Sequence, residues 1–359
     1  ARGKYVAWSE KQGGFWVVAG YDEAVDAARH PEIFSNTQPT LPPYPLEEPF
    51  MIVSYDDPEH KEVRSLVNRP FNPVGVNQYA DLIRENVNLL VDGFIAEGKA
   101  DLARVIAKPI PAMVTALIMG LPAAEGPKFS RWVAAIAEDH LMPPEVAKAQ
   151  RDEMYGYFGE TVAHHRTHEG SDVLSQVIRT EVDGRSFTYK ELMGFCTILM
   201  VGGIDNTARL LASMLWHLGG DPALRKQLAA DPTLIPAAVQ EFLRVYSPAH
   251  VGRLILQDTN FHGAEMKAGE YALLAFPIAN RDPRAFPDPD RFVVDRKPNV
   301  HVALGIGPHR CLGTHLIALE AKIVLEEILT RIPDFENDTA LGAEWLPGQV
   351  SGMVSVPVT

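Results

Sequence analysis

The chain has 359 residues, 46% of them hydrophobic, which is enough to bury a large core in two or three domains or in one domain built around a cofactor. Its formal net charge is -13 at pH 7 and its pI is about 5.4, values that argue against nucleic acid or an anionic membrane as the main partner. Because its two cysteines, Cys196 and Cys311, lie in unlike surroundings, a disulfide framework is not expected.

The first fifty residues are expected to form a small mixed β region. They begin without the apolar run of a signal peptide, and no later stretch reaches the roughly 18 apolar residues of a membrane span, so we expect a cytoplasmic protein. Alternating apolar residues around Phe15–Val18 predict a strand, and the pattern at Tyr21–Arg29 predicts a short helix. Four prolines within residues 40–50 predict a long ordered loop, of the kind that often lines a binding site.

The remainder of the chain is predicted to be mainly helical, with a minor β part. Amphipathic patterns predict helices at residues 58–68, 76–97, 146–168, 188–217, 221–229 and 233–246, and a further helix at 311–331. Strand-like runs occur at residues 253–261, 271–276 and 349–358.

One loop combines glycines with a single cysteine and runs directly into a helix. Residues 301–323 read HVALGIGPHRCLGTHLIALEAKI, and Cys311 lies at the junction. Glycines allow close backbone approach, and a helix N-terminus stabilises a thiolate, so the loop suits a cysteinate that ligates a haem iron. A buried structural cysteine is one alternative. A zinc site is the other, but Cys311 with His301, His309 and His315 fits no closed zinc pattern well.

The segment GIGPHRCLG resembles the haem-binding loop of cytochromes P450, F-x-x-G-x-x-x-C-x-G, with Gly307, Cys311 and Gly313 at the matching positions and Leu304 in place of the aromatic residue. The similarity extends over nearly the whole chain, from GGFWVVAGY to EWLPGQVSGM. It implies a single haem domain over residues 1–359, with haem b, a long central helix over the haem and Cys311 as the iron ligand beneath. Its β-rich part would comprise about 1–55, 251–277 and 349–358, and its helical part about 58–246 and 311–331.

Glu241 and Arg244 lie three residues apart on a predicted helix, so their side chains share a face and can pair. Such pairs are usually solvated surface contacts. The P450 resemblance implies instead a structural triad beneath the haem, in which Arg296 is the third member.

The apolar helix that starts near Phe195 is interrupted by glycines and polar residues at Gly202, Gly203, Asp205, Asn206 and Thr207. Each interior glycine costs about 0.5–1 kcal/mol, and a buried acid needs partners, so we expect a functional reason. The resemblance implies that this is the central helix, in which Asp205 relays protons. Asn206 stands where the family usually has threonine, and its carboxamide is expected to order water near bound dioxygen.

Four further residues, His60, Arg64, Arg253 and His309, match family positions that bind the two haem propionates, although each alone resembles an ordinary surface residue. Charge-assisted hydrogen bonds to carboxylates are strong. The family's usual aspartate two residues before the arginine is Val251 here, which is a departure from the pattern.

Within the family the chain is most similar to bacterial enzymes that hydroxylate bicyclic monoterpenes, camphor and especially 1,8-cineole. The resemblance places Tyr44 at the position that binds the substrate's ether oxygen, although a surface-packed loop aromatic is the alternative. The pocket walls expected by analogy are Leu199, Met200, Gly203, Ala249 and Val350 or Ser351. These small or aliphatic residues suit a compact apolar substrate.

The resemblance implies a monomeric monooxygenase that uses O2 and two electrons from a separate ferredoxin or flavodoxin with its reductase. The donor is expected to dock on a positive patch that contains Lys61, Arg64, Arg69 and Arg310. The alternative substrates for such a monooxygenase are other small terpenoids and aromatic ethers. A peroxide-driven peroxygenase is a rival that Asp205 argues against, and a haem-based sensor or electron carrier is a rival from outside the enzymes.

Overall fold

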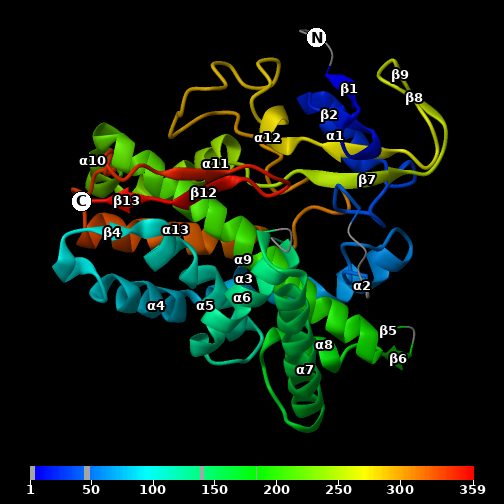
Figure 1. The fold of residues 1–359 in the computed structure, drawn as a ribbon, viewed down its shortest axis with the longest axis horizontal. Helices are drawn as coiled ribbons and strands as arrows, with labels where there is room; N and C mark the ends of the chain where they lie inside the picture. The colour runs from blue at the N-terminus through cyan, green and yellow to red at the C-terminus, as the bar shows by residue number, and fades with distance from the viewer. Residues whose placement is uncertain (1–4, 44–48, 138–140, 183) are drawn as a thin grey trace.

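The computed structural model describes residues 5–43, 49–137, 141–182 and 184–359. Helices make up most of the molecule, and the largest sheet lies at one end of it, beside the N-terminus (Figure 1). The chain therefore has the mainly helical architecture with a minor β region that the sequence predicts.

Most of the predicted helices occur near their predicted bounds. The helices of the structure are α1 Tyr21–Arg29, α2 Glu59–Val67, α3 Pro73–Asn77, α4 Ala80–Asp92, α5 Pro109–Ile118, α6 Gly126–Ala137, α7 Pro144–Thr167, α8 Val173–Ile178, α9 Tyr189–Gly220, α10 Pro222–Ala230, α11 Ile235–Val245, α12 Phe276–Ala279 and α13 Thr314–Arg331, with a π-helix at Ala103–Ala107. Among these, the structure adds α5, α6, α8, α12 and the π-helix, for which no individual helix was predicted. The single helix predicted at 76–97 is wrong, because the chain turns at Gln78 and Tyr79 between α3 and α4. The helix predicted from residue 311 begins at Thr314, after the cysteine loop.

The largest sheet has the order β1-β2-β10-β7-β3. Its strands are β1 Val6–Ser9, β2 Phe15–Val18, β3 Phe34–Ser35, β7 Val251–Ile255 and β10 Tyr271–Leu274. Strands β2 and β10 run parallel, with Trp16 opposite Ala272. The sheet therefore joins the N-terminal β segment to the β segment near residues 251–277. The smaller sheets pair β4 Ala100–Asp101 with β13 Pro357–Val358, β5 Glu181–Val182 with β6 Arg185–Ser186, β8 Thr259–Phe261 with β9 Ala264–Met266, and β11 Glu344–Leu346 with β12 Gly352–Ser355.

Two runs predicted as strands are divided in the structure. The run 253–261 turns after Ile255 and continues as β8, and the run 349–358 is broken into an isolated bridge at Val350 followed by β12 and β13. The turns allow each piece to pair with a different partner, so the two runs are not continuous strands.

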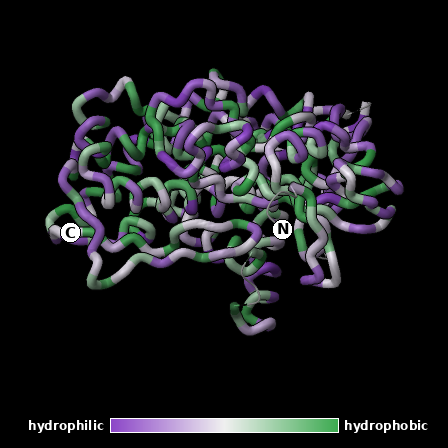
Figure 2. The backbone as a smooth tube through the Cα atoms, turned by 90° about the horizontal axis from the view of Figure 1, so that it is seen from above, coloured by the Kyte–Doolittle hydropathy of each residue, from purple (hydrophilic) through white to green (hydrophobic). Residues whose placement is uncertain are grey.

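Helix α9 runs through the centre of the molecule (Figure 1) and packs against α5, α6 and β12. A capping box of Thr188 and Glu191 fixes its start. Its length and its mean hydropathy of 1.2 over 18 residues suffice for a membrane span, contrary to our sequence estimate, but 61% of that window is buried inside the protein. Figure 2 shows hydrophobic and hydrophilic positions alternating along most of the chain, which is typical of elements with one buried face.

Candidate functional site

Cys311 lies at the end of a tightly turned loop and just before α13. Its backbone N–H donates to the Leu304 carbonyl at 2.8 Å, and its own carbonyl accepts a bond from Thr314 Oγ1 at 2.7 Å. Gly307 has φ +76°, and a Cβ there would lie 2.6 Å from the Ala28 carbonyl oxygen, so only glycine fits this approach to α1.

The Cys311 thiol is accessible and yet surrounded by protein, which places it in a recess rather than on the outer surface. Burial raises the pKa of the Cys311 thiol, while a backbone hydrogen bond from Gly313 and the charges of Arg64 and Arg310 act in the opposite direction. These three groups favour the thiolate that a metal would bind.

Four basic side chains from α2, β7 and the cysteine loop converge beside this thiol. His60 and Arg253 are 2% and 4% exposed, and the rings of His60 and His309 are 3.9 Å apart. Burial, and then the proximity of His60, Arg253 and Arg64, lower the pKa of His309 to about 2. Such a concentration of buried positive and donor groups requires an anionic ligand.

Several hydrogen-bonding atoms of these side chains are available to bind that ligand. The Nε2 atoms of His60 and His309 are buried and have no hydrogen-bond partner in the described chain. Arg253 donates to the Gly252 carbonyl at 2.7 Å, forms no ion pair with a described residue, and has its pKa lowered to about 10 by burial. Together with Cys311, the cluster fits an iron porphyrin with two carboxylates.

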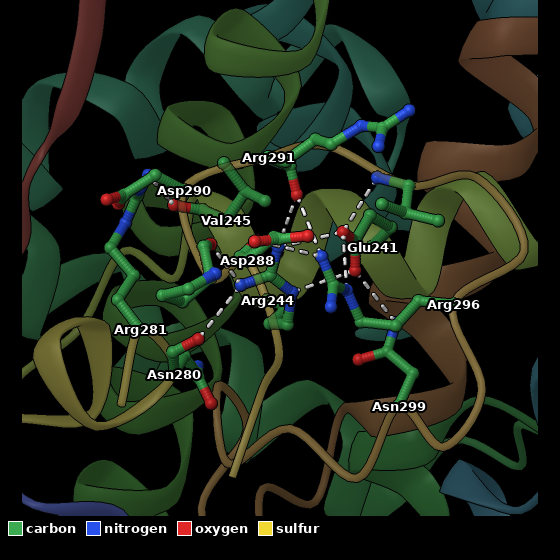
Figure 3. A network of polar contacts seen from close by, with 12 residues as sticks. Glu241, Arg244, Val245, Asn280, Arg281, Asp288, Asp290, Arg291, Arg296 and Asn299 are labelled. Carbon is green, nitrogen blue, oxygen red and sulfur yellow. Dashed lines mark hydrogen bonds and ion pairs between the residues drawn. The ribbon is translucent and has the colours of Figure 1, made fainter. Parts of the chain in front are cut away.

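Glu241, Arg244 and Arg296, the predicted triad, meet in one network (Figure 3), in which Glu241 and Arg244 are fully buried and Arg296 is 7% exposed. Arg244 Nη2 and Nε each lie 2.8 Å from a Glu241 oxygen, and Arg296 Nε lies 3.0 Å from Glu241 Oε1. The remaining N–H groups of Arg244 donate to the carbonyls of Asn280, Pro289 and Arg291. The network thus fixes the segment that leads from α12 to the cysteine loop against α11.

Helix α9 presents the predicted polar residues on different sides. Asp205 Oδ1 pairs with Arg209 Nε at 3.1 Å, whereas Asn206 Oδ1 is buried without a hydrogen-bond partner in the described chain. Thr207 is only 3% exposed and lies in the core.

Among the predicted pocket residues of α9, Gly203 and Met200 face protein rather than open space. A Cβ at Gly203 would lie 2.9 Å from Thr115 Oγ1 on α5, and Met200 has no exposed surface. Gly202 instead has open space beside it, with Ile198 Cδ1 at 3.8 Å as the neighbour, and the predicted Leu199 is 8% exposed. Gly202 therefore replaces Gly203 as the candidate for the cavity wall, because Gly203 is needed for close packing with α5.

The structure brings together the other predicted wall residues. Ala249 and Val350 form an isolated antiparallel bridge, and Ser351 N donates to the Pro248 carbonyl at 2.8 Å. Gln349 binds both Pro39 and Leu41, which ties this turn to the start of the proline-rich loop. Tyr44 lies outside the described residues.

Both cysteines are free, and Cys311 is exposed, unlike the buried structural cysteine that was one alternative. No group of three or more His, Cys, Asp or Glu suited to a metal occurs among residues 5–43, 49–137, 141–182 and 184–359, so the zinc alternative has no support there. Lys61, Arg69 and Arg310 are exposed, but Arg64 is half-buried and its guanidinium binds the Arg310 carbonyl. Arg64 therefore belongs to the cluster beside the thiol more than to an outer docking patch.

Three residues that the sequence reading missed take part in these arrangements. Arg209 is the partner of Asp205, Asn299 binds Glu241, and Glu320 is a buried acid on α13. Four-residue spacing to Asp205 was a usable signal for Arg209, and the apolar face of the 311–331 pattern was one for Glu320.

Comparisons with known proteins agree with this geometry. The cytochrome P450 family model matches residues 145–332. The chain is 32% identical over 355 residues to cytochrome P450 monooxygenase PikC of Streptomyces venezuelae, covering 96% of this chain and 84% of PikC. It is 33% identical over 358 residues to a steroid C26-monooxygenase of Mycolicibacterium smegmatis, with coverages of 96% and 87%.

A solved structure, the hydroxylase HmtN, superposes with a TM-score of 0.90 at 28% identity and covers 100% of this chain and 93% of HmtN. Sequence and fold thus agree over almost the full length of these proteins. This chain belongs to the cytochrome P450 family of haem b monooxygenases.

Proposed function

We propose that this monooxygenase hydroxylates a small apolar substrate, a bicyclic monoterpene such as 1,8-cineole. The observation that supports the proposal is the antiparallel bridge between Ala249 and Val350, which puts two of the expected wall residues next to each other. Leu199, which is 8% exposed, and Gly202, which has open space beside it, are the candidate wall positions on α9. Small and aliphatic wall residues suit a compact apolar substrate.

The overall reaction consumes the substrate, O2, two electrons and two protons, and releases the alcohol and water. When bound, haem ligated by Cys311 supplies dioxygen activation and oxygen insertion into a C–H bond. His60, Arg64, Arg253 and His309 hold its two carboxylates through charge-assisted hydrogen bonds.

The chain's other groups position the substrate and move protons. Asp205 passes protons inward from solvent, and the carboxamide of Asn206, whose Oδ1 has no hydrogen-bond partner among the described residues, would order water near bound dioxygen. The apolar walls exclude bulk water and hold the reacting C–H bond in place. The electrons come from a separate ferredoxin or flavodoxin with its reductase.

A steroid is the competing substrate class, because one relative at 33% identity is named a steroid C26-monooxygenase. A steroid needs a longer cavity than a bicyclic monoterpene. The small and aliphatic residues at the expected wall positions are the reason for proposing the smaller substrate.

The test starts with a ferrous carbon monoxide difference spectrum, followed by ferric titrations with 1,8-cineole, camphor and testosterone. A thiolate-type Soret band and a shift from low to high spin with cineole support the proposal. A shift with testosterone alone replaces the monoterpene by a steroid, and no shift with any small molecule favours a sensor or electron carrier. Product formation driven by hydrogen peroxide alone, at the rate obtained with ferredoxin, favours a peroxygenase.

Tyr44 offers a sharper test of the cineole assignment. Replacement by phenylalanine removes the donor proposed for the ether oxygen, so we expect Tyr44→Phe to weaken cineole binding about tenfold, the value of one hydrogen bond. Binding of a hydrocarbon such as limonene, which has no acceptor oxygen, serves as the control. Equal weakening for both ligands would show that the hydroxyl does not recognise the ether.

A further inference from the structure

Asp205 is held by an arginine of its own helix, one turn further along α9. Arg209 Nε lies 3.1 Å from Asp205 Oδ1, and the two side chains are 6% and 17% exposed. A largely buried ion pair of this kind is stronger than a fully exposed pair, and the arginine charge favours the ionised carboxylate.

The same two side chains line a cavity of about 480 Å³ that lies between α9, α6, the π-helix with the following Lys108, and the hairpin β11–β12. Ile204, Ala208 and Ala212 continue this face along α9. The adjacent residue Asn206 does not line this cavity, and its Oδ1 is buried without a hydrogen-bond partner in the part of the chain that the structure describes. Asp205 and Asn206 therefore face different surroundings across the helix.

Strand β12 holds Arg209 in place from outside the helix. A Cβ at Gly352 would lie 2.7 Å from Arg209 Cβ, so the strand approaches α9 more closely than any other residue would allow. Ser213 Oγ donates to the Arg209 carbonyl at 2.8 Å and accepts a bond from Met353 N at 3.3 Å. The position of the arginine is thus set by the hairpin as well as by α9.

We propose that Arg209 is a positioning residue that holds Asp205 toward this cavity and sets the pH range in which Asp205 takes up a proton from cavity water. The inference rests on the proposed proton relay through Asp205. In each transfer, water in the cavity protonates the carboxylate. The carboxyl then releases that proton inward, toward Asn206, and the resulting carboxylate pairs again with Arg209.

Other charged groups face the same cavity and contribute to its potential. Arg104 and Lys108 come from the π-helix and the residue before α5, and Glu344 comes from β11. Arg104 is largely exposed and pairs with Asp101 at 3.2 Å, and Glu344 is exposed. Because solvent screens exposed charges, Arg209 has the strongest influence on Asp205 among these groups.

The experiment measures the titration of Asp205 directly in the ferric holoenzyme, by infrared difference spectroscopy of its carboxyl band, assigned by subtraction of Asp205→Asn. We expect Arg209→Met to move the midpoint upward by about 1 to 3 pH units, since an opposite charge at this distance produces shifts of that size. Arg209→Lys retains the charge and should restore most of the wild-type midpoint. Gly352→Ala, which displaces Arg209 without removing it, should move the midpoint in the same direction as Arg209→Met.

The second readout is the pH dependence of NADPH and O2 consumption with a surrogate ferredoxin and its reductase. Its alkaline limb should follow the infrared midpoints across the variants. An unchanged midpoint in Arg209→Met, or in Gly352→Ala if Arg209→Met does not fold, overturns the inference. If Asp205→Asn leaves consumption and coupling unchanged, the relay in the proposed function fails, whatever the midpoints show.

Discussion

At the scale of single residues, several buried polar atoms have no hydrogen-bond partner among the described residues, and a ligand or ordered water is expected beside them. Buried polar groups are nearly always hydrogen-bonded, so an unpartnered one requires an explanation. The Nε2 atoms of His60 and His309 point to an anionic ligand beside Cys311, and Asn206 Oδ1 points to ordered water. Glu320 is different, because burial raises its pKa to about 8 and keeps it neutral near pH 7.

Asn206 gives a prediction about coupling. If its carboxamide orders the water that accompanies proton delivery, Asn206→Ala should divert electrons to hydrogen peroxide and lower the product formed per NADPH. Asn206→Thr, which restores the family's usual hydroxyl, is the matched control and should recover coupling. The ratio of product and peroxide to NADPH consumed measures the effect, and unchanged coupling in Asn206→Ala would eliminate the assigned role.

Glu320 gives a prediction about pH and stability. Its folded-state pKa of about 8 lies above the reference value of 4.5, so folding binds a proton and the cost of keeping the acid neutral grows as pH rises between these values. Glu320→Gln removes that cost. The unfolding free energy of the variant relative to wild type should therefore increase by about 1.4 kcal/mol per pH unit across this window.

Urea unfolding at pH 5 and pH 8 checks this difference. Glu326 on the same helix is the control, because it pairs with Arg84 at 2.7 Å and with Lys322 at 3.0 Å, and its pKa is lowered. Glu326→Gln should therefore reduce stability at both pH values. Parallel pH curves for Glu320→Gln and wild type would contradict the buried neutral acid.

Candidate site residues could be predicted from the sequence where a short motif identifies them, such as Cys311 in its glycine loop and Glu241 with Arg244 on one helix face. The sequence could not predict which side of α9 each glycine faces, since that depends on Thr115 of α5. Arg209 was also missed, although its four-residue spacing from Asp205 on the same helix is a signal for an ion pair.

At the scale of elements, long amphipathic helices were predictable and short or fully apolar ones were not. Helix α5, PIPAMVTALI, is buried on nearly all sides, so it has no polar face from which a helical period could be recognised. The run 253–261 has a composition typical of one continuous strand. The structure divides it by a turn, because β7 pairs with β10 whereas β8 pairs with β9. For both elements, the contacts with the rest of the fold determine the secondary structure, because the local sequence pattern is compatible with more than one.

The network between α11 and the following segment gives a prediction at this scale (Figure 3). Arg244→Lys loses the paired bonds to Glu241 and the bonds to three carbonyls in a fully buried site. We expect a loss of about 3–5 kcal/mol in unfolding free energy, with reduced haem content, because a buried charge is left poorly paired.

Arg281→Lys is the matched control, since the same substitution there affects an arginine whose partner Asp290 is largely exposed. Arg281→Lys should lower the unfolding free energy by less than about 1 kcal/mol. Thermal unfolding and the haem-to-protein absorbance ratio measure both variants. Equal losses for the two substitutions would show that burial of the Glu241 network does not govern its contribution.

At the scale of the whole molecule, the candidate site lies where the larger helical core and the smaller β core meet. Its basic groups come from α2, β7 and the cysteine loop, which are separated by up to about 250 residues of chain, so only the complete fold brings them together. No local pattern predicts this convergence, and the family resemblance alone indicated it. Haem binding and folding should therefore be coupled.

Arg253 allows that coupling to be tested. In the apoprotein its buried guanidinium has no described carboxylate partner, so Arg253→Leu should stabilise the apoprotein, by on the order of 2 kcal/mol. In the holoprotein the same substitution removes a charge-assisted bond worth about 1.5–3 kcal/mol, so haem should transfer to apomyoglobin roughly 10- to 100-fold faster. Arg253→Lys keeps the charge, so its apoprotein stability and its rate of haem transfer should both lie between those of Arg253→Leu and wild type. A leucine variant that is less stable in both forms would indicate that Arg253 supports the β core itself, independently of the haem carboxylates.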